Sequence, residues 1–201
     1  MASESELTTR SCLVCGSPTT KSCSGCKSAS YCNDEHQKQD WRSHKEYCLK
    51  IKAAGTNTFD AILFPATETK PRLVKVPWKL VHEDPNDPYA LSWQQLDNSP
   101  WFKHPNSAVK SHYIPRWGIN GRELEHPLCM RYDDNFGMNG LPLNRCVVSL
   151  TKGQAGHQWC GNILALRMGE SYDYYDNVNM EEDLKALVKY FEEYNKVMPK
   201  Y

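Results

Sequence analysis

The sequence has no excess of either charge and no long apolar run. Lys plus Arg balances Asp plus Glu, 24 against 24, so no overall field favours nucleic-acid backbones or anionic membranes. No segment approaches the roughly 18 apolar residues of a membrane helix, and the opening residues, MASESELTTR, have no apolar signal core. We therefore expect a cytoplasmic or nuclear protein with neither a nucleic-acid nor a membrane partner.

Cysteine, by contrast, is abundant, and its nine residues are unevenly spread. Six of the nine lie between residues 12 and 48, and the other three are Cys129, Cys146 and Cys160. Where thiols stay reduced, so many cysteines favour metal binding over disulfides. The uneven spread also indicates a boundary near residue 50, with a small metal-binding module before it.

Within residues 12–48, eight Cys and His residues form four closely spaced pairs. Two are Cys-x2-Cys pairs, in which a tight turn brings both sulfurs to one ion. The other two have a spacing of four, which places both members on one face of a helix. The candidate ligands are Cys12, Cys15, Cys23, Cys26, Cys32, His36, His44 and Cys48. Eight donors fill two closed tetrahedral sites, which predicts two structural zinc ions and no catalytic water. Spacing alone does not fix which pairs share an ion.

This order of ligands resembles the MYND-type zinc finger and lacks the Cys-x-His-x2-Cys segment of a RING. The matching positions are the two Cys-x2-Cys pairs, Tyr31-Cys32, His36-Gln37, Trp41, His44-Lys45 and Cys48. His36 departs from the family, whose commonest ligand there is Cys, but zinc accepts an imidazole nitrogen as readily as a thiolate. The resemblance implies a cross-braced arrangement with two ligand sets. They are Cys12, Cys15, Cys32 and His36 for one ion, and Cys23, Cys26, His44 and Cys48 for the other.

The resemblance also implies a protein-interaction adaptor. A module of this size has almost no apolar core, so the ions hold its fold and its two short helices present a surface. In MYND fingers that surface binds short Pro-containing peptides, and the groove residues correspond here to Gln37 and Trp41. An indole suits a proline ring, and an amide can bond an extended backbone. The alternatives are that Trp41 packs inside the zinc fold and that Gln37 is an ordinary solvated residue.

We predict an α+β protein in four segments: a tail at 1–11, the finger at 12–48, a linker at 49–60 and an α+β domain at 61–201. Runs rich in β-branched and aliphatic residues predict strands at 61–64, 72–81, 145–150 and 162–168. Asp87 followed by Pro88 predicts a short helix through 89–96. Asn179 predicts the cap of a C-terminal helix, with Glu182 three residues on. The second region is similar to small fungal proteins that carry the same finger, a similarity that implies no activity.

An enzyme or a third metal site in the second region is the alternative hypothesis. His126-x2-Cys129 and His157-x2-Cys160 repeat one spacing, with Cys146 between them. Such residues can hold a metal or form a Cys–His nucleophile, but they border apolar runs, where a buried thiol is ordinary. MYND fingers also occur beside SET methyltransferase domains, whose Asn-His-Ser/Cys segment is absent here. We therefore expect a protein that is not an enzyme.

Overall fold

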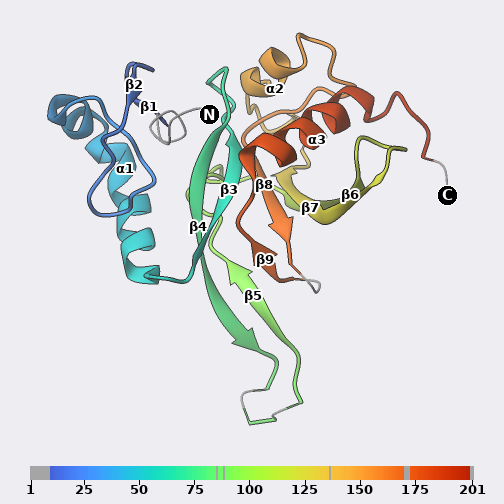
Figure 1. The fold of residues 1–201 in the computed structure, drawn as a ribbon, viewed down its shortest axis with the longest axis horizontal. Coiled ribbons are helices and arrows are strands. Elements are labelled where there is room, and N and C mark those ends of the chain that lie inside the picture. Colours follow the sequence, from blue (N-terminus) through green and yellow to red (C-terminus); the bar gives the residue numbers. More distant parts are fainter. Residues whose placement is uncertain (1–9, 85, 88, 136, 170–172, 200–201) are drawn as a thin grey trace, which may run out of the picture. The chain divides into compact units, whose positions relative to one another are not determined.

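The computed structural model divides the chain into two compact units between Thr58 and Phe59 (Figure 1). It describes residues 10–84, 86–87, 89–135, 137–169 and 173–199. None of the helices in these ranges is long and apolar enough to cross a membrane.

The first unit consists of a short hairpin and one long helix. Strands β1 (Arg10–Ser11) and β2 (Pro18–Thr19) pair in antiparallel fashion, and helix α1 spans Asp34–Ala54. Asn33 caps α1 by accepting a hydrogen bond from the backbone N–H of His36 at 2.8 Å. One continuous helix therefore replaces the two short helices that we expected.

Helix α1 also runs through the first half of the segment predicted as a linker at 49–60. The helix keeps burying one face as far as Ile51, and it ends only at Gly55, whose φ of 60° suits glycine. Strand β3 begins at Thr58. Because a buried face stabilises a helix beyond its weak local signals, the irregular connection shrinks to residues 55–57.

The second unit is built on a seven-stranded sheet with the order β5-β4-β3-β8-β7-β6, and β9 pairs with β8. The strands are β3 (Thr58–Phe64), β4 (Arg72–His82), β5 (Ser92–Leu96), β6 (Val109–Arg116), β7 (Glu123–Asp133), β8 (Ile163–Met168) and β9 (Tyr175–Asp176). The helices are α2 (Arg145–Leu150) and α3 (Met180–Glu193). An α+β fold with a C-terminal helix is thus confirmed.

Both faces of the central strands are buried. On β3, Ile62 and Phe64 belong to the apolar cluster that includes residues of α2 and α3. Ala61 and Leu63 belong to a separate cluster, against which Trp101 and others pack. Alternate side chains of a strand point to opposite faces, so the sheet separates two cores. In the first, the ring of Phe64 packs edge-on against Phe191 of α3 at a centroid distance of 5.2 Å.

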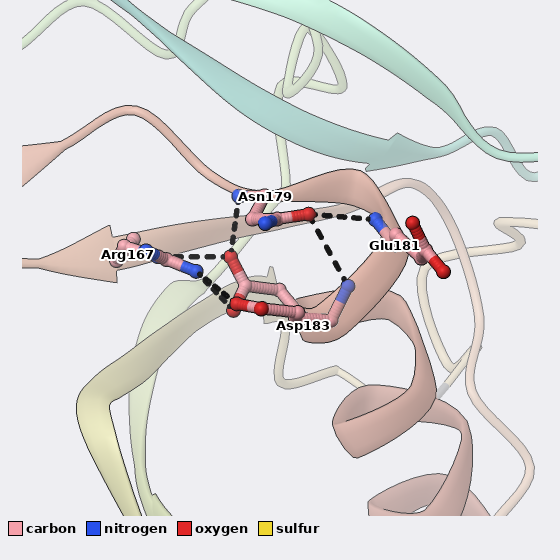
Figure 2. A network of polar contacts seen from close by, with 5 residues as sticks. Arg167, Asn179, Glu181 and Asp183 are labelled. Atoms are coloured by element: carbon pink, nitrogen blue, oxygen red, sulfur yellow. Dashed lines mark hydrogen bonds and ion pairs between the residues drawn. The ribbon is translucent and has the colours of Figure 1, made fainter. Parts of the chain in front are cut away.

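Helix α3 begins as predicted, at the cap residue Asn179. Its Oδ1 accepts hydrogen bonds from the backbone N–H groups of Glu181 and Glu182 (Figure 2). The acid that reaches back to the Asn179 N–H is Asp183, at 2.7 Å, rather than Glu182. Asp183 faces the sheet and is buried, whereas Glu182 is exposed.

Two predictions of secondary structure are wrong: one predicted strand is a helix, and part of one predicted helix is a strand. Residues 145–150, predicted as a strand, form helix α2, which Asn144 caps through the backbone N–H of Val147. Residues 92–96, predicted as part of a helix, form β5, where Trp93 pairs with Val81 of β4. The Asp87 carboxylate accepts a hydrogen bond from the Tyr89 N–H in a turn, and Pro88 lies outside the described residues.

Candidate metal centre

The first ligand set joins the hairpin of the finger to the start of α1. Cys12 Sγ lies 3.5 Å from His36 Nδ1, Cys32 Sγ lies 3.0 Å from the same nitrogen, and Cys15 Sγ lies 3.6 Å from Cys32 Sγ. These four ligand atoms all lie within 4.8 Å of one another. Cys12 is buried, Cys15 is exposed, and the other two are half-buried. We call this group the first site.

The second ligand set joins the second Cys-x2-Cys turn to the middle of α1, and we call it the second site. Cys23 Sγ lies 3.7 Å from Cys48 Sγ, and Cys26 Sγ lies 3.5 Å from His44 Nε2. All four residues are buried. Gly25 is required here, because a Cβ at this position would come within 2.8 Å of the Cys48 sulfur.

Both sets fit tetrahedral zinc. Ligand bonds of about 2.3 Å for sulfur and 2.0 Å for nitrogen give tetrahedron edges of roughly 3.5–3.8 Å. Four of the five ligand–ligand distances given above, at 3.5–3.7 Å, have that length. The two groups are the sets that the resemblance implies. Two Cys3His sites typical of structural zinc are thus confirmed.

The two Cys-x2-Cys turns share one backbone pattern. The carbonyl of Cys12 accepts the N–H of Gly16, and that of Cys23 accepts the N–H of Lys27, each at 2.9 Å. Gly16 and Lys27 both have positive φ, 74° and 57°. The two turns therefore have the same backbone geometry. A positive φ is unfavourable for Lys27, which unlike Gly16 has a side chain. The Arg10 guanidinium donates a hydrogen bond to the Lys27 carbonyl at 2.8 Å and so stabilises this turn.

The thiols of each site differ in acidity. Burial raises the pKa of Cys12, but backbone N–H groups of Cys15, Cys32 and Val14 outweigh it and lower the pKa to about 6. Burial, together with the Cys15 and Cys12 thiols, raises the pKa of Cys32 to about 11. A second negative charge is thus unfavourable beside the first, and a divalent cation stabilises both thiolates.

The same contrast occurs in the second site. Backbone N–H groups of Cys26 and Gly25 lower the pKa of Cys23 against the effect of burial. Burial and the Cys23 thiol raise the pKa of Cys48 to about 12. Burial lowers the pKa of His44, which keeps its imidazole neutral, the form that binds a metal.

The two predicted partner-binding residues lie on α1 beside the second site. Gln37 is half-buried and donates a hydrogen bond from Nε2 to Cys23 Sγ at 3.9 Å. The ring of Trp41 lies 6.1 Å from that of His44 and remains 41% exposed. Trp41 therefore does not pack inside the zinc fold, and Gln37 is not simply solvated.

The cysteines and histidines of the second unit do not gather in the same way. Cys129 and Cys146 are buried in the two separate cores, on opposite sides of the sheet. His126 is exposed, and the His157 ring packs against Trp159 at 4.8 Å. In the described ranges, the only groups of three or more candidate ligands are the two sites of the finger. The alternative hypothesis of a third metal site therefore has no matching ligand group in the part of the chain that the structure describes.

Comparison with known proteins agrees with this geometry. The family model for the MYND finger matches residues 12–48. Residues 12–48 are a MYND finger. Such fingers are protein-interaction domains, and this one builds two Cys3His sites from two turns, helix α1 and Cys32 just before it.

The curated relatives share only a short stretch with the chain. Ubiquitin carboxyl-terminal hydrolase 19 of Arabidopsis thaliana is 38% identical over 79 residues, 34% of this chain and 12% of the relative. Programmed cell death protein 2 of Mus musculus is 53% identical over 40 residues, 19% of this chain and 12% of the relative. Protein CBFA2T2 of Xenopus laevis is 40% identical over 48 residues, 24% of this chain and 8% of the relative.

The chain thus spans about an eighth or less of the length of these relatives, and no solved structure matches it.

Some exposed residues of α1 are not among the predicted site residues. Lys38, Lys45, Leu49 and Lys52 are exposed on the face that carries Trp41. The sequence could have indicated this shared face, because Lys38, Trp41, Lys45, Leu49 and Lys52 follow one another at intervals of three or four residues, which places them on one side of a helix.

Proposed function

We propose that the protein is a zinc-dependent adaptor whose finger binds short, Pro-containing segments of partner proteins at Gln37 and Trp41. One observation carries the proposal: each of these residues contacts a ligand of the second site while part of it remains accessible. The zinc ion therefore holds both side chains at a surface rather than in a core.

The chemistry of the two side chains suits an extended peptide. Trp41 offers a flat, half-exposed indole on which a proline ring can pack. Gln37 uses its Nε2 for Cys23 Sγ, which leaves Oε1 to accept a backbone N–H of the peptide. Gln37 and Trp41 are four residues apart, so they lie side by side on α1.

In this proposal the zinc ions are structural and the protein is not an enzyme. Each site has four protein ligands, so no position is open for a substrate or a reactive water. The apolar core of the finger is small and comprises, besides the zinc-site cysteines, Ala29, Tyr31 and Ile51. Metal loss is therefore expected to unfold it. We propose that the protein acts in the cytoplasm or nucleus, where thiols stay reduced.

A peptide array tests the proposal. The full-length protein is applied to short Pro-containing peptides and to the same peptides with Ala in place of Pro. We expect Pro-dependent binding that a chelator abolishes and that Trp41→Ala weakens about tenfold or more, the loss of a large aromatic contact. Ser43→Ala, on the other side of α1, serves as the matched control.

The zinc content of Trp41→Ala decides how a loss of peptide binding is interpreted. Trp41→Ala has to retain two zinc ions per chain, because a loss of metal would mean a loss of fold. If Trp41→Ala retains two zinc ions and binds the same peptides with unchanged affinity, the proposed peptide site at Gln37 and Trp41 is wrong.

A further inference from the structure

Helix α1 carries an exposed stripe in which basic and apolar residues alternate. Lys38, Trp41, Lys45, Leu49 and Lys52 follow one another at intervals of three or four residues, so they share one side of the helix. Trp41 is 41% exposed and Leu49 53% exposed, and the three lysines are exposed as well. We call these five residues the α1 stripe. At 1.5 Å per residue it is about 21 Å long.

The acidic residues of the helix do not neutralise the stripe. The Tyr31 hydroxyl donates a hydrogen bond to Asp40 at 2.6 Å, and Glu46 lies 3.8 Å from the Lys50 ammonium. Asp34 and Glu35 are in the first turn of α1, where the helix dipole already compensates their charge. Lys38, Lys45 and Lys52 form no ion pair within the described ranges.

We propose that the α1 stripe makes the finger selective for acidic peptide segments of a partner protein. The segment runs along α1 on both sides of the Trp41 contact, from Lys38 to Lys52, places an apolar side chain on Leu49 and directs carboxylates to the three lysines. This inference rests on the proposed function, because it extends the Gln37–Trp41 site along the same helix. The occupant is a peptide rather than a nucleic acid, since the finger is a protein-interaction domain and the chain has no net charge.

We expect the lysines of the α1 stripe to change the affinity for acidic peptides moderately, so that other peptides still bind. An exposed ion pair changes affinity by roughly 1.5- to 5-fold, so three pairs give about a tenfold preference. Lysine ammonium groups are compact and strongly hydrated, which suits steering and selection more than tight holding. Salt screens such pairs, so the preference shrinks as the ionic strength rises.

The test uses three labelled pools of short Pro-containing peptides that differ only at the positions flanking Pro, which hold Glu, Gln or Lys. Fluorescence anisotropy measures each pool against the full-length, zinc-loaded protein. We expect the Glu pool to bind about tenfold more tightly than the Gln pool and the Lys pool to bind least. Replacing the three stripe lysines together by Gln should remove the difference and leave binding of the Gln pool unchanged. The matched control removes three exposed lysines elsewhere: Lys21→Gln, Lys70→Gln and Lys79→Gln.

The outcomes separate this inference from the proposed function. If all pools bind equally and Trp41→Ala weakens all of them, the peptide site stands and the acidic preference is wrong. If no pool binds in a Trp41-dependent way, the proposed function itself is wrong. A single-stranded oligonucleotide is the remaining probe. Tighter binding of it than of the Glu pool, lost with the stripe lysines, would assign the stripe to nucleic acid and overturn the inference.

Discussion

Gln37 donates a hydrogen bond to Cys23 Sγ, so a residue of the proposed peptide site touches a zinc ligand directly. Trp41 has a similar relation to His44, across 6.1 Å between ring centroids. Both contacts go to ligands of the second site. The two sites therefore have different roles, although both hold the finger together.

Removal of one ligand from each site tests this difference. Cys26→Ala should abolish peptide binding, because it removes a zinc ligand from the second site, whose other ligands contact Gln37 and Trp41. Cys15→Ala should weaken binding only a few-fold, because Cys15 is exposed and lies in the first site. Zinc content and anisotropy with the Pro-containing peptides are measured together on each variant. Equal loss of binding in the two variants would show that the sites act as one unit.

The sites should also release zinc at different rates. All four ligands of the second site are buried, whereas only Cys12 is buried in the first site. A chelator reaches exposed ligands more easily, so we expect one zinc per chain to leave in a fast phase and one in a phase at least about tenfold slower. A chromogenic chelator in stopped flow gives both amplitudes. Loss of both ions in a single phase contradicts the prediction.

The finger could be predicted from its sequence because its chemistry is local. Eight ligands at fixed spacings define a metal site whatever surrounds them. The end of α1 could not be predicted in this way. Ile51 is buried together with the ligand residues of the finger, and only the tertiary structure reveals that this face continues past Cys48.

The second unit shows where local signals fail. Residues 145–150 contain adjacent valines, which favour a strand, yet they form α2. The neighbouring Asn144 is fully buried, caps the helix, and donates hydrogen bonds to the carbonyls of Phe64 and Gly161 at 2.9 and 2.7 Å. Those partners are distant in sequence. Strands β6 and β7 were not predicted, and each contains a proline, which weakens a strand signal.

Two half-buried histidines of the second unit, His112 and His157, predict a pH dependence. Burial lowers the pKa of His112 and of His157 below the usual 6.5. The His112 ring packs against Tyr190 and Tyr194 at centroid distances of 5.5 and 5.8 Å. The folded protein thus prefers the neutral rings. Their stabilisation is complete above pH 6.5 and is lost as the pH falls through the folded-state pKa.

His112→Phe measures this dependence, because Phe keeps an aromatic ring that cannot be protonated. Between about pH 6.5 and 5, we expect the free energy of unfolding of the variant to fall less steeply, by up to about 1.4 kcal/mol per pH unit. The zinc ligands titrate equally in both proteins, so the difference isolates His112. His126→Gln, at an exposed position, is the control and should keep the wild-type slope. A wild-type slope in His112→Phe would contradict the prediction.

A buried ion pair attaches α3 to the sheet. The Arg167 guanidinium of β8 donates two hydrogen bonds to the Asp183 carboxylate, at 2.9 and 3.0 Å (Figure 2). The side chains of Arg167 and Asp183 are 16% and 8% exposed. The same arginine also lies 3.5 Å from Glu182, whose side chain is 72% exposed. One arginine thus has a buried and a solvated partner in adjacent positions.

Asp183→Ala should lower the free energy of unfolding of the second unit by about 3–5 kcal/mol, because it leaves the Arg167 charge without its buried partner. It also removes the acceptor of the Asn179 N–H. Glu182→Ala is the matched control and should cost less than about 1 kcal/mol, as exposed pairs do. The double variant Arg167→Met/Asp183→Leu should recover much of the loss, since no unpaired charge remains. Urea unfolding of the full-length, zinc-loaded proteins measures all three. Equal losses for Asp183→Ala and Glu182→Ala would show that the buried pair does not hold α3 in place.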